Sequence, residues 1–209
     1  MKIEQLLPEQ IEKRSFEMIS EELNRDLDPL LKPIIYRVIH TTADFDYADT
    51  MYFSEGVVEH ALEALKKGAT IVTDTNMALS GINKKALEAL GCRALCYIAD
   101  PEVAKEAKKH ATTRAHAAVD KAAKISGPLI FVVGNAPTAL LRLRELIDEK
   151  EFKPELIIGV PVGFVNVEVA KERIIETDVP VIVSRGRKGG SNVAAAIVNA
   201  LMYQLTRDS

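Results

Sequence analysis

The stretch LIFVVGNAPTALLRLRELIDE, Leu129 to Glu149, decides the fold of this chain. It opens with the apolar run LIFVV, which has the length and character of a short buried strand. A loop of small, turn-forming residues, GNAPT, follows, and the remainder places leucines at helical spacing. A strand that is apolar on both sides and leads into an amphipathic helix is typical of a parallel sheet with helices on both faces.

The same alternation of strand and helix continues along the chain from Ser54 onward. The predicted strands cover residues 69–73, 94–99, 129–133, 156–160 and 181–184, and the predicted helices cover 55–67, 82–90, 102–124 with a candidate break near Thr112, 138–149, 167–175 and 191–205. We therefore expect an α/β fold, a three-layer α/β/α sandwich with a mainly parallel five-stranded sheet.

The N-terminal segment, residues 1–53, is predicted to be helical and to belong to one single domain, residues 1–209. Pro8 suits the first position of a helix, and Asp28-Pro29 ends that helical pattern. The next segment, residues 30–40, is apolar on most sides and is compatible with helix or strand, of which we favour helix.

Composition and charge narrow the classes of function. The net charge is −3 and the chain has no Trp, so it lacks a broad basic face and base-stacking side chains, and we expect no nucleic-acid partner. The apolar runs are strand-sized and the N-terminal residues lack an apolar core, so we expect no membrane span, no secretory signal and a cytoplasmic protein. Cys92 and Cys96 alone make neither a disulfide framework nor a zinc site.

The loop RGRKGGSN, residues 185–192, follows the last predicted strand and combines three cations with three glycines. No acid occurs between Val179 and Arg207, and Ser191 or Asn192 suits a helix N-cap. Free N–H groups, a helix N-terminus and cationic side chains all favour a bound anion, although a solvated turn would use the same glycines. The loop has neither the Walker A nor the dinucleotide-binding spacing, so carboxylates are favoured over ATP and NAD.

His40 ends an apolar segment in YRVIHTTADFD, residues 36–46. A histidine in such a position most often has a structural role. Here Thr41, Thr42 and Asp44 supply hydroxyls and a carboxylate that can orient an imidazole or raise its pKa, as a general acid near neutral pH requires. A second candidate is Asp74, which follows the first predicted strand, where open α/β sheets bind ligands.

Six short motifs occur in order along nearly the whole chain. They are RSFEMI from Arg14, YRVIHTTAD from Tyr36, DTNMALSGI from Asp74, GNAPTAL from Gly134, GVPVGFV from Gly159 and GRKGGSNVAAAIVNAL from Gly186. Together they resemble one family, the precorrin-8X or cobalt-precorrin-8 methylmutases of cobalamin (vitamin B12) biosynthesis.

The resemblance implies an isomerase that moves a methyl group from carbon 11 to carbon 12 of precorrin-8X or cobalt-precorrin-8, giving hydrogenobyrinate or cobyrinate. It also implies no organic cofactor, a homodimer with active sites near the subunit interface, and a catalytic acid at the histidine of the R-x-x-H-x-T-x-D run, which is His40. After PVGFV this chain has Val169, Ala170 and Lys171 where the family has Glu-Ser-Lys, so the first two positions lack the family's side chains.

The patterns and the resemblance together give the expected site, with His40 as the catalytic residue and no metal ligand. The expected substrate-binding residues are Ser15, Arg37, Thr42, Asp44, Asp74, Asn76, Met77, Arg114, Asn135, Arg185, Gly186, Arg187, Lys188, Gly189, Gly190 and Ser191. Two alternative functions stay open: a corrinoid-binding or carrier protein without catalysis, and a phosphate-handling α/β enzyme that uses GRKGGS as its phosphate loop.

Overall fold

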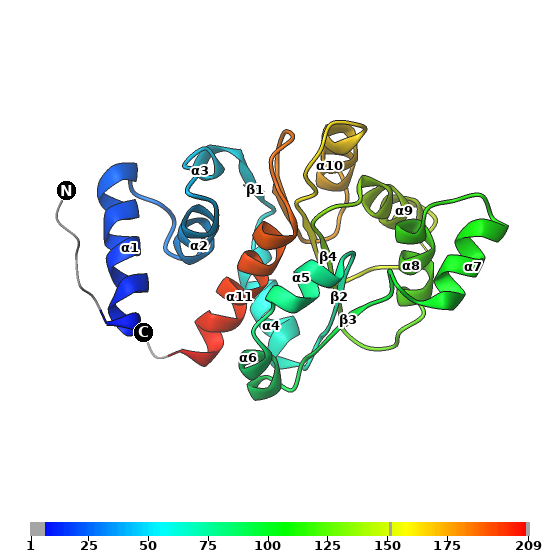
Figure 1. Cartoon of the computed structure of the whole chain (residues 1–209), viewed down its shortest axis with the longest axis horizontal. Coiled ribbons are helices and arrows are strands. Elements are labelled where there is room, and N and C mark those ends of the chain that lie inside the picture. Colours follow the sequence, from blue (N-terminus) through cyan, green and yellow to red (C-terminus); the bar gives the residue numbers. More distant parts are fainter. Residues whose placement is uncertain (1–6, 151, 208–209) are drawn as a thin grey trace.

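The computed structural model describes residues 7–150 and 152–207 (Figure 1). The helices are α1 (Pro8–Leu23), α2 (Lys32–Thr42), α3 (Tyr47–Thr50), α4 (Val57–Lys66), α5 (Asn76–Gly81), α6 (Lys84–Ala89), α7 (Pro101–Lys109), α8 (Arg114–Ala122), α9 (Pro137–Asp148), α10 (Val167–Ile175) and α11 (Ser191–Thr206). The strands are β1 (Met51–Phe53), β2 (Thr70–Thr73), β3 (Arg93–Cys96), β4 (Leu129–Val133), β5 (Leu156–Gly159) and β6 (Val181–Ser184).

The strands form one sheet in the order β1-β6-β5-β4-β2-β3. Strands β2 to β6 are parallel, and β1 pairs with β6 in the antiparallel direction. The α/β fold with a mainly parallel sheet is confirmed, but the sheet of the described residues has six strands where five were predicted. The sixth, β1, lies inside the segment 1–53 that was predicted to be helical. It has only three residues, all half-buried, so the sequence contains no apolar run from which this strand could be predicted.

Alternate side chains of the sheet enter two separate cores, as the two-residue period of a strand requires. Ile130 and Val132 of β4 pack with α4, α5, α6 and α11, whereas Phe131 and Val133 pack with α8, α9 and α10. The three predicted layers are therefore present, and the apolar runs in the sequence reflect burial on both faces. Helix α7 covers α8 from outside, around Val103.

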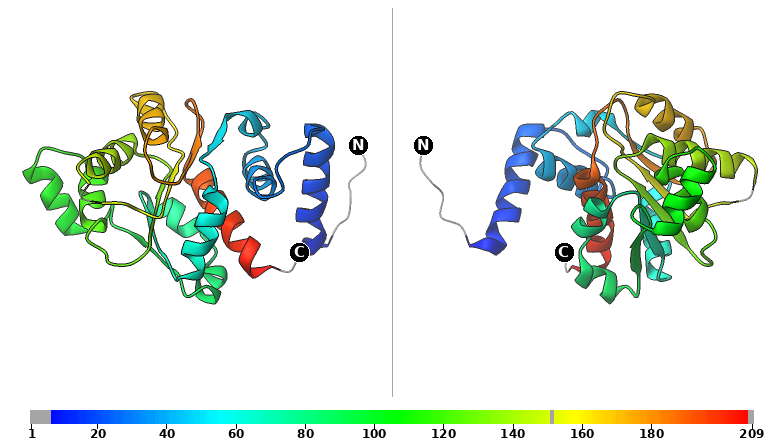
Figure 2. Two further views of the ribbon diagram at one scale, coloured as in Figure 1. Left: turned by 180° about the vertical axis from the view of Figure 1, so that it is seen from behind. Right: turned by 45° about the vertical axis from the view of Figure 1, so that its right-hand side comes forward.

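The N-terminal helices add to one face of this sandwich. Helix α2 packs against α11, and α1 packs against α2. Figure 2 shows α1 and α7 at opposite ends of the molecule. Residues 32–42 form the helix that we favoured, and the predicted break near Thr112 separates α7 from α8. No helix of the described residues is long and apolar enough to cross a membrane.

Helix α5 is a correction, because residues 76–81 lie outside the helices and strands that were predicted and were therefore expected to be a loop. The Oγ1 atom of Thr75 accepts a hydrogen bond from the N–H of Ala78 at 3.1 Å and caps the helix. Four of the six residues of α5 are small or polar, which resembles a loop in sequence, and only Met77 and Leu79 are large and apolar.

The sheet order creates a topological switch point at one place. From β2 the chain proceeds to the outer strand β3 and then returns past β2 to β4, so the connections leave β2 and β4 in opposite directions. Open α/β sheets bind ligands at the carboxyl ends of the strands beside such a switch point. Asp74 and Gly134 come directly after these two strands.

Candidate active site

Asp74 holds together the two loops at the switch point. Its Oδ1 accepts a hydrogen bond from the N–H of Gly134 at 2.9 Å, and its Oδ2 accepts from the N–H groups of Asn135 and Ala136 at 2.8 and 2.7 Å. Burial raises the pKa of Asp74, and the three N–H groups, which favour the carboxylate, oppose that rise. The predicted site residues Asp74 and Asn135 are thus in contact, with the Asn135 side chain exposed.

The start of α11 closes against the same two loops. Ser191, a predicted site residue, shares a 2.7 Å hydrogen bond between its hydroxyl and that of Thr75. Gly134 lies so close to it that an added Cβ would stand 2.8 Å from the Cα of Ser191. Asn76 and Met77 begin α5 beside Thr75 and are exposed.

The loop of residues 185–190, called the cationic loop below, rises between α3 and α10 (Figure 1). Each of its cations has an acidic partner from another element. The ion pairs are Arg185 with Glu172 at 3.5 Å, Arg187 with Glu168 at 3.1 Å, and Lys188 with both Asp44 and Asp46 at 2.6 Å. Although the sequence around the loop contains no acid, its cations are therefore paired with acids that come from α10 and from the segment after α2.

Lys171 supports this loop from inside the protein, a role that the sequence analysis missed. It lies on the buried stripe of α10 formed by Val167, Ala170 and Ile174, and its side chain has no exposed surface. Burial lowers its pKa to about 8, against the opposing charges of Glu168 and Glu172. A lysine on the apolar face of a predicted helix was the signal that could have identified it.

His40 lies in the last turn of α2 and is exposed. Its ring meets the ring of Phe16 edge-on, with the centroids 5.7 Å apart. Two of the three side chains expected to orient it are engaged elsewhere: the Thr42 hydroxyl donates to the Val38 carbonyl at 2.8 Å, and Asp44 accepts from Lys188. The hydrogen bond from Lys188 lowers the pKa of Asp44.

Arg37 and Ser15 have partners away from the cationic loop. Arg37 donates two hydrogen bonds to the carboxylate of Glu12, at 3.1 and 2.9 Å, and its guanidinium also lies over the rings of Phe16 and Tyr203. The Ser15 hydroxyl donates to the carbonyl of Ile11 within α1, at 2.8 Å. Arg37 thus joins α2 to α1 and α11, whereas the Ser15 side chain bonds only within α1.

Arg114 is the first residue of α8 and is exposed. Its neighbour Thr113 shares a 2.9 Å hydrogen bond with Thr138, which belongs to the first turn of α9. The start of α8 therefore lies beside the loop of Asn135, and the structure brings Arg114 to the same edge of the sheet as the cationic loop.

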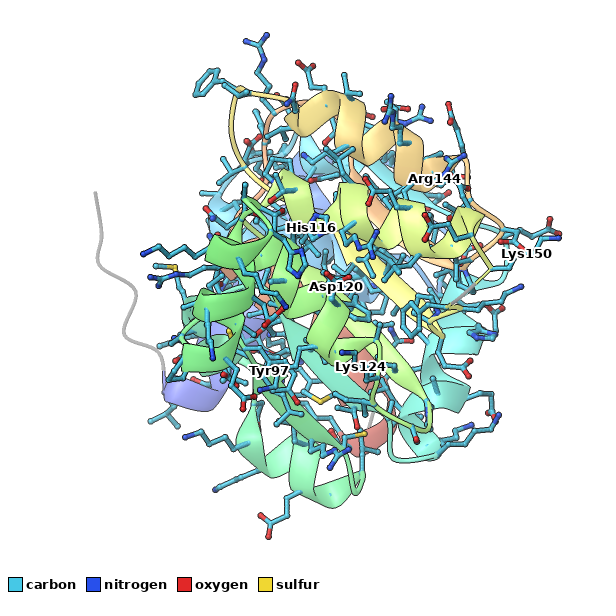
Figure 3. The ribbon with its side chains drawn as sticks, turned by 90° about the vertical axis from the view of Figure 1, so that its right-hand side faces the viewer. Tyr97, His116, Asp120, Lys124, Arg144 and Lys150 are labelled. Atoms are coloured by element: carbon cyan, nitrogen blue, oxygen red, sulfur yellow. The ribbon has the colours of Figure 1, made fainter. Side chains whose placement is uncertain are left out.

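Two surface hollows of the described residues have linings that include neither His40 nor the cationic loop. One, of about 1080 Å³, lies among α7, α8 and α9. Figure 3 looks onto this face and shows His116 and Asp120 on α8 and Lys124 just after that helix. The other, of about 900 Å³, lies among α1, α2 and α11 and is lined in part by Arg37. Within the described residues, no His, Cys, Asp and Glu side chains group so as to hold a metal ion.

Comparisons with known proteins agree with the motifs. The family model described as precorrin-8X methylmutase matches residues 10–204. Cobalt-precorrin-8 methylmutase of Salmonella typhimurium is 47% identical over 95% of this chain and 96% of its own length, and precorrin-8X methylmutase of Pseudomonas aeruginosa is 37% identical over 91% and 93%.

A solved structure supports the same conclusion. The crystal structure of a precorrin-8X methylmutase from Thermus thermophilus superposes with a TM-score of 0.86 at 43% identity, covering 93% of this chain and 94% of that one. With a family model and close relatives spanning nearly its whole length, the chain belongs to the precorrin-8X methylmutase family and is an isomerase of cobalamin biosynthesis.

Proposed function

We propose that this isomerase moves the methyl group from carbon 11 to carbon 12 of precorrin-8X or cobalt-precorrin-8, with His40 as the general acid. The observation that carries this proposal is an exposed imidazole at the end of α2, where Asp44 joins the helix end to the cationic loop. The reaction rearranges one molecule, so it requires neither a nucleophile nor a leaving group. Protonation of a ring nitrogen by His40 would withdraw electron density from the migrating system and stabilise the transition state preferentially.

The cationic loop and Arg114 would bind the carboxylates of the macrocycle. Arg185, Arg187 and Lys188 are all exposed, and their present partners are carboxylates of the protein. Exposed ion pairs contribute little net free energy, so a substrate carboxylate can replace an internal one at small cost. Binding the periphery of the ring in this way would fix its reacting atoms relative to His40.

We also propose that the enzyme acts in the cytoplasm as a homodimer without an organic cofactor. The dimer is supported by a short segment that presents large apolar side chains to solvent, among them Phe164 at 81% and Val165 at 77% exposure. Apolar side chains clustered at the surface of a soluble protein mark interaction sites.

The test of the general acid compares His40→Ala with His60→Ala. His60 is also exposed, but it lies on α4 and pairs with Glu155, so its loss is the matched control. We expect His40→Ala to bind the macrocycle within a few-fold of the parent and to lose roughly 10²–10⁴-fold in turnover. His60→Ala should keep full turnover.

The assay follows the absorbance of the product with metal-free and with cobalt-bearing substrate, since the relatives carry both names. The form that is converted identifies the natural substrate. Full turnover by His40→Ala would remove the imidazole from the mechanism. Stoichiometric binding of the macrocycle without conversion by the parent protein would favour the carrier alternative.

A further inference from the structure

One face of α10 is devoted to the cationic loop. Glu168, Lys171 and Glu172 follow one another at helical spacing, and all three contact that loop or the strand end before it. The two acids hold arginine side chains at the surface, whereas the lysine reaches the backbone from below. The helix therefore fixes both the side chains and the main chain of the loop.

The contacts of Lys171 are to oxygen atoms. Its Nζ donates hydrogen bonds to the carbonyl of Gly186 at 2.7 Å, to the carbonyl of Lys188 at 2.8 Å and to the hydroxyl of Ser184 at 3.3 Å. The Ser184 hydroxyl in turn donates to the Lys188 carbonyl at 2.9 Å. Two alternate carbonyls of the loop thus point inward to one buried ammonium group.

This arrangement determines where the loop's N–H groups point. In a trans peptide the C=O of one residue and the N–H of the next point in opposite directions, and the described residues contain no cis peptide. The N–H groups of Arg187 and Gly189 therefore point away from Lys171. Among the described residues, neither N–H has a hydrogen-bond acceptor.

Unpaired backbone N–H groups in a glycine-rich turn form an anion-binding concavity. Gly189 and Gly190, with φ of 159° and 138°, provide the backbone freedom that this turn requires. Two N–H groups beside the side chains of Arg187 and Lys188 offer a carboxylate both hydrogen bonds and charge. A side chain that holds the two carbonyls inward would keep those donors in position before the ligand arrives.

We propose that Lys171 is a positioning residue that holds the carbonyls of Gly186 and Lys188 inward, so that the N–H groups of Arg187 and Gly189 receive a carboxylate of the substrate. The carboxylate as ligand rests on the proposed function, whereas the ordering of the loop by Lys171 does not. Lys171 itself is buried and does not touch the substrate in this proposal.

A pH signature follows from the charge of Lys171. The charged groups around it are Glu168 and Glu172 on α10, and Arg185, Arg187 and Lys188 on the cationic loop. Each of these three cations forms an ion pair with an acid. Strand β6 contributes only the uncharged Ser184. With a pKa of about 8, Lys171 loses its proton between pH 7 and 9, and a neutral amine makes weaker hydrogen bonds to carbonyls.

The experiment compares Lys171→Met with Arg173→Met, which removes an exposed cation from the same helix. In the absence of substrate, amide hydrogen exchange is measured at Gly163 and Gly190, whose N–H groups bond to Arg187 and Val160 carbonyls at 3.2 and 2.9 Å. We expect at least about 10-fold faster exchange at both in Lys171→Met, with β4 unchanged and Arg173→Met equal to the parent. Unchanged exchange would overturn the proposal.

With substrate, Lys171→Met should raise KM about 10-fold and leave kcat within about 3-fold, since it affects the binding of a remote carboxylate. Should that variant not fold, the parent alone decides: the Kd of the product should rise several-fold from pH 7 to 9, and a flat profile would overturn the proposal. A parent protein that binds no macrocycle refutes the proposed function, while the exchange measurement still judges the role of Lys171.

Discussion

Arg37 and His40 lie one helical turn apart on α2, yet their surroundings differ. Arg37 is held by Glu12 and two aromatic rings, whereas His40 is exposed and contacts only the edge of Phe16 among the ring contacts of the described residues. A sequence motif places both residues on one helix but does not say which of them is engaged. That depends on α1 and α11, which are distant in sequence.

The carboxylate of Asp74 should contribute strongly to stability, because it accepts hydrogen bonds from three backbone N–H groups at once. Asp74→Asn keeps the shape but turns an NH₂ group toward these donors. We expect a loss of about 2–3 kcal/mol in the free energy of unfolding, measured by urea denaturation. The control Asp178→Asn removes an exposed carboxylate paired with Lys153, and its unfolding midpoint should stay unchanged. Equal unfolding midpoints for both variants would contradict a stabilising role of the three hydrogen bonds to Asp74.

Alanine substitutions at two glycines of the cationic loop should differ in their effect on stability. A Cβ on Gly189 would stand 2.1 Å from the Val160 carbonyl oxygen, whereas one on Gly186 would meet nothing within 4 Å, although its φ is +74°. Gly186→Ala should therefore cost about 1 kcal/mol from backbone strain alone. Gly189→Ala should cost about 3 kcal/mol and also raise KM, because the loop must move. Urea denaturation and steady-state kinetics measure both effects, and indistinguishable variants would refute the close approach.

The third prediction concerns the stability contribution of Lys171. Its pKa is about 8 in the folded protein against an ordinary 10.5, so the unfolded chain binds more protons between these values, and stability rises with pH across that window. At about 1.4 kcal/mol for each pKa unit, the rise is about 3 kcal/mol. Lys171→Met should remove it, as urea denaturation at pH 7.5 and 10 would reveal. A parent profile as flat as that of the variant would show that burial does not lower the pKa of Lys171.

Among the secondary-structure elements, the inner strands could be predicted from short, continuous apolar runs and the regular helices from periodic apolar patterns. Strands β2, β4, β5 and β6 are buried throughout, and the helices that follow them are amphipathic. Strand β1 and helix α5 could not be predicted, because three half-buried residues, or six residues with only Met77 and Leu79 large and apolar, have no usable period. Their structure comes from tertiary pairing with β6 and from the Thr75 cap.

The acids that face the cationic loop were equally hidden from the sequence. Glu168 and Glu172 are ordinary surface residues of an amphipathic helix until α10 is placed beside β6. Asp44 and Asp46 follow α2, more than a hundred residues before Lys188. The candidate loop could be found from its local composition, but its electrostatic balance depends on long-range packing.

The packing of α1 against the rest of the protein should depend on the charge of Glu12. Hydrogen bonds from Arg37 lower the pKa of Glu12, and Arg207 adds a further ion pair at 2.7 Å. Because the folded pKa lies below 4.5, this stabilisation is present above the unfolded pKa and is lost as pH falls through the folded one. Glu12→Gln should therefore expose the segment of residues 24–31 to proteolysis at neutral pH. Glu21→Gln, at an exposed position of the same helix, should leave the cleavage rate unchanged.

For the whole molecule, the order of the strands explains why the candidate residues gather. Since the connections of β2 and β4 diverge, the loops of Asp74 and Asn135 lie side by side at the switch point, and α11 begins directly against them. The sequence predicted parallel strands with polar loops at their carboxyl ends, but the strand order, and hence which loops become neighbours, is set by packing of the complete chain. Motifs alone therefore predict which residues are candidates, but not which of them become neighbours.

The proposed homodimer can be tested at one segment: Phe164, Val165 and Val169 expose large apolar side chains before and within the first turns of α10. We expect this segment to be buried between two copies of the chain, so Phe164→Asp should place a charge in the interface and shift sedimentation velocity from dimer to monomer. Leu30→Asp is the control, since Leu30 is also an exposed apolar residue but lies between α1 and α2. A dimer that survives Phe164→Asp with a raised KM would assign the segment to the macrocycle, whereas a monomeric parent would refute the dimer.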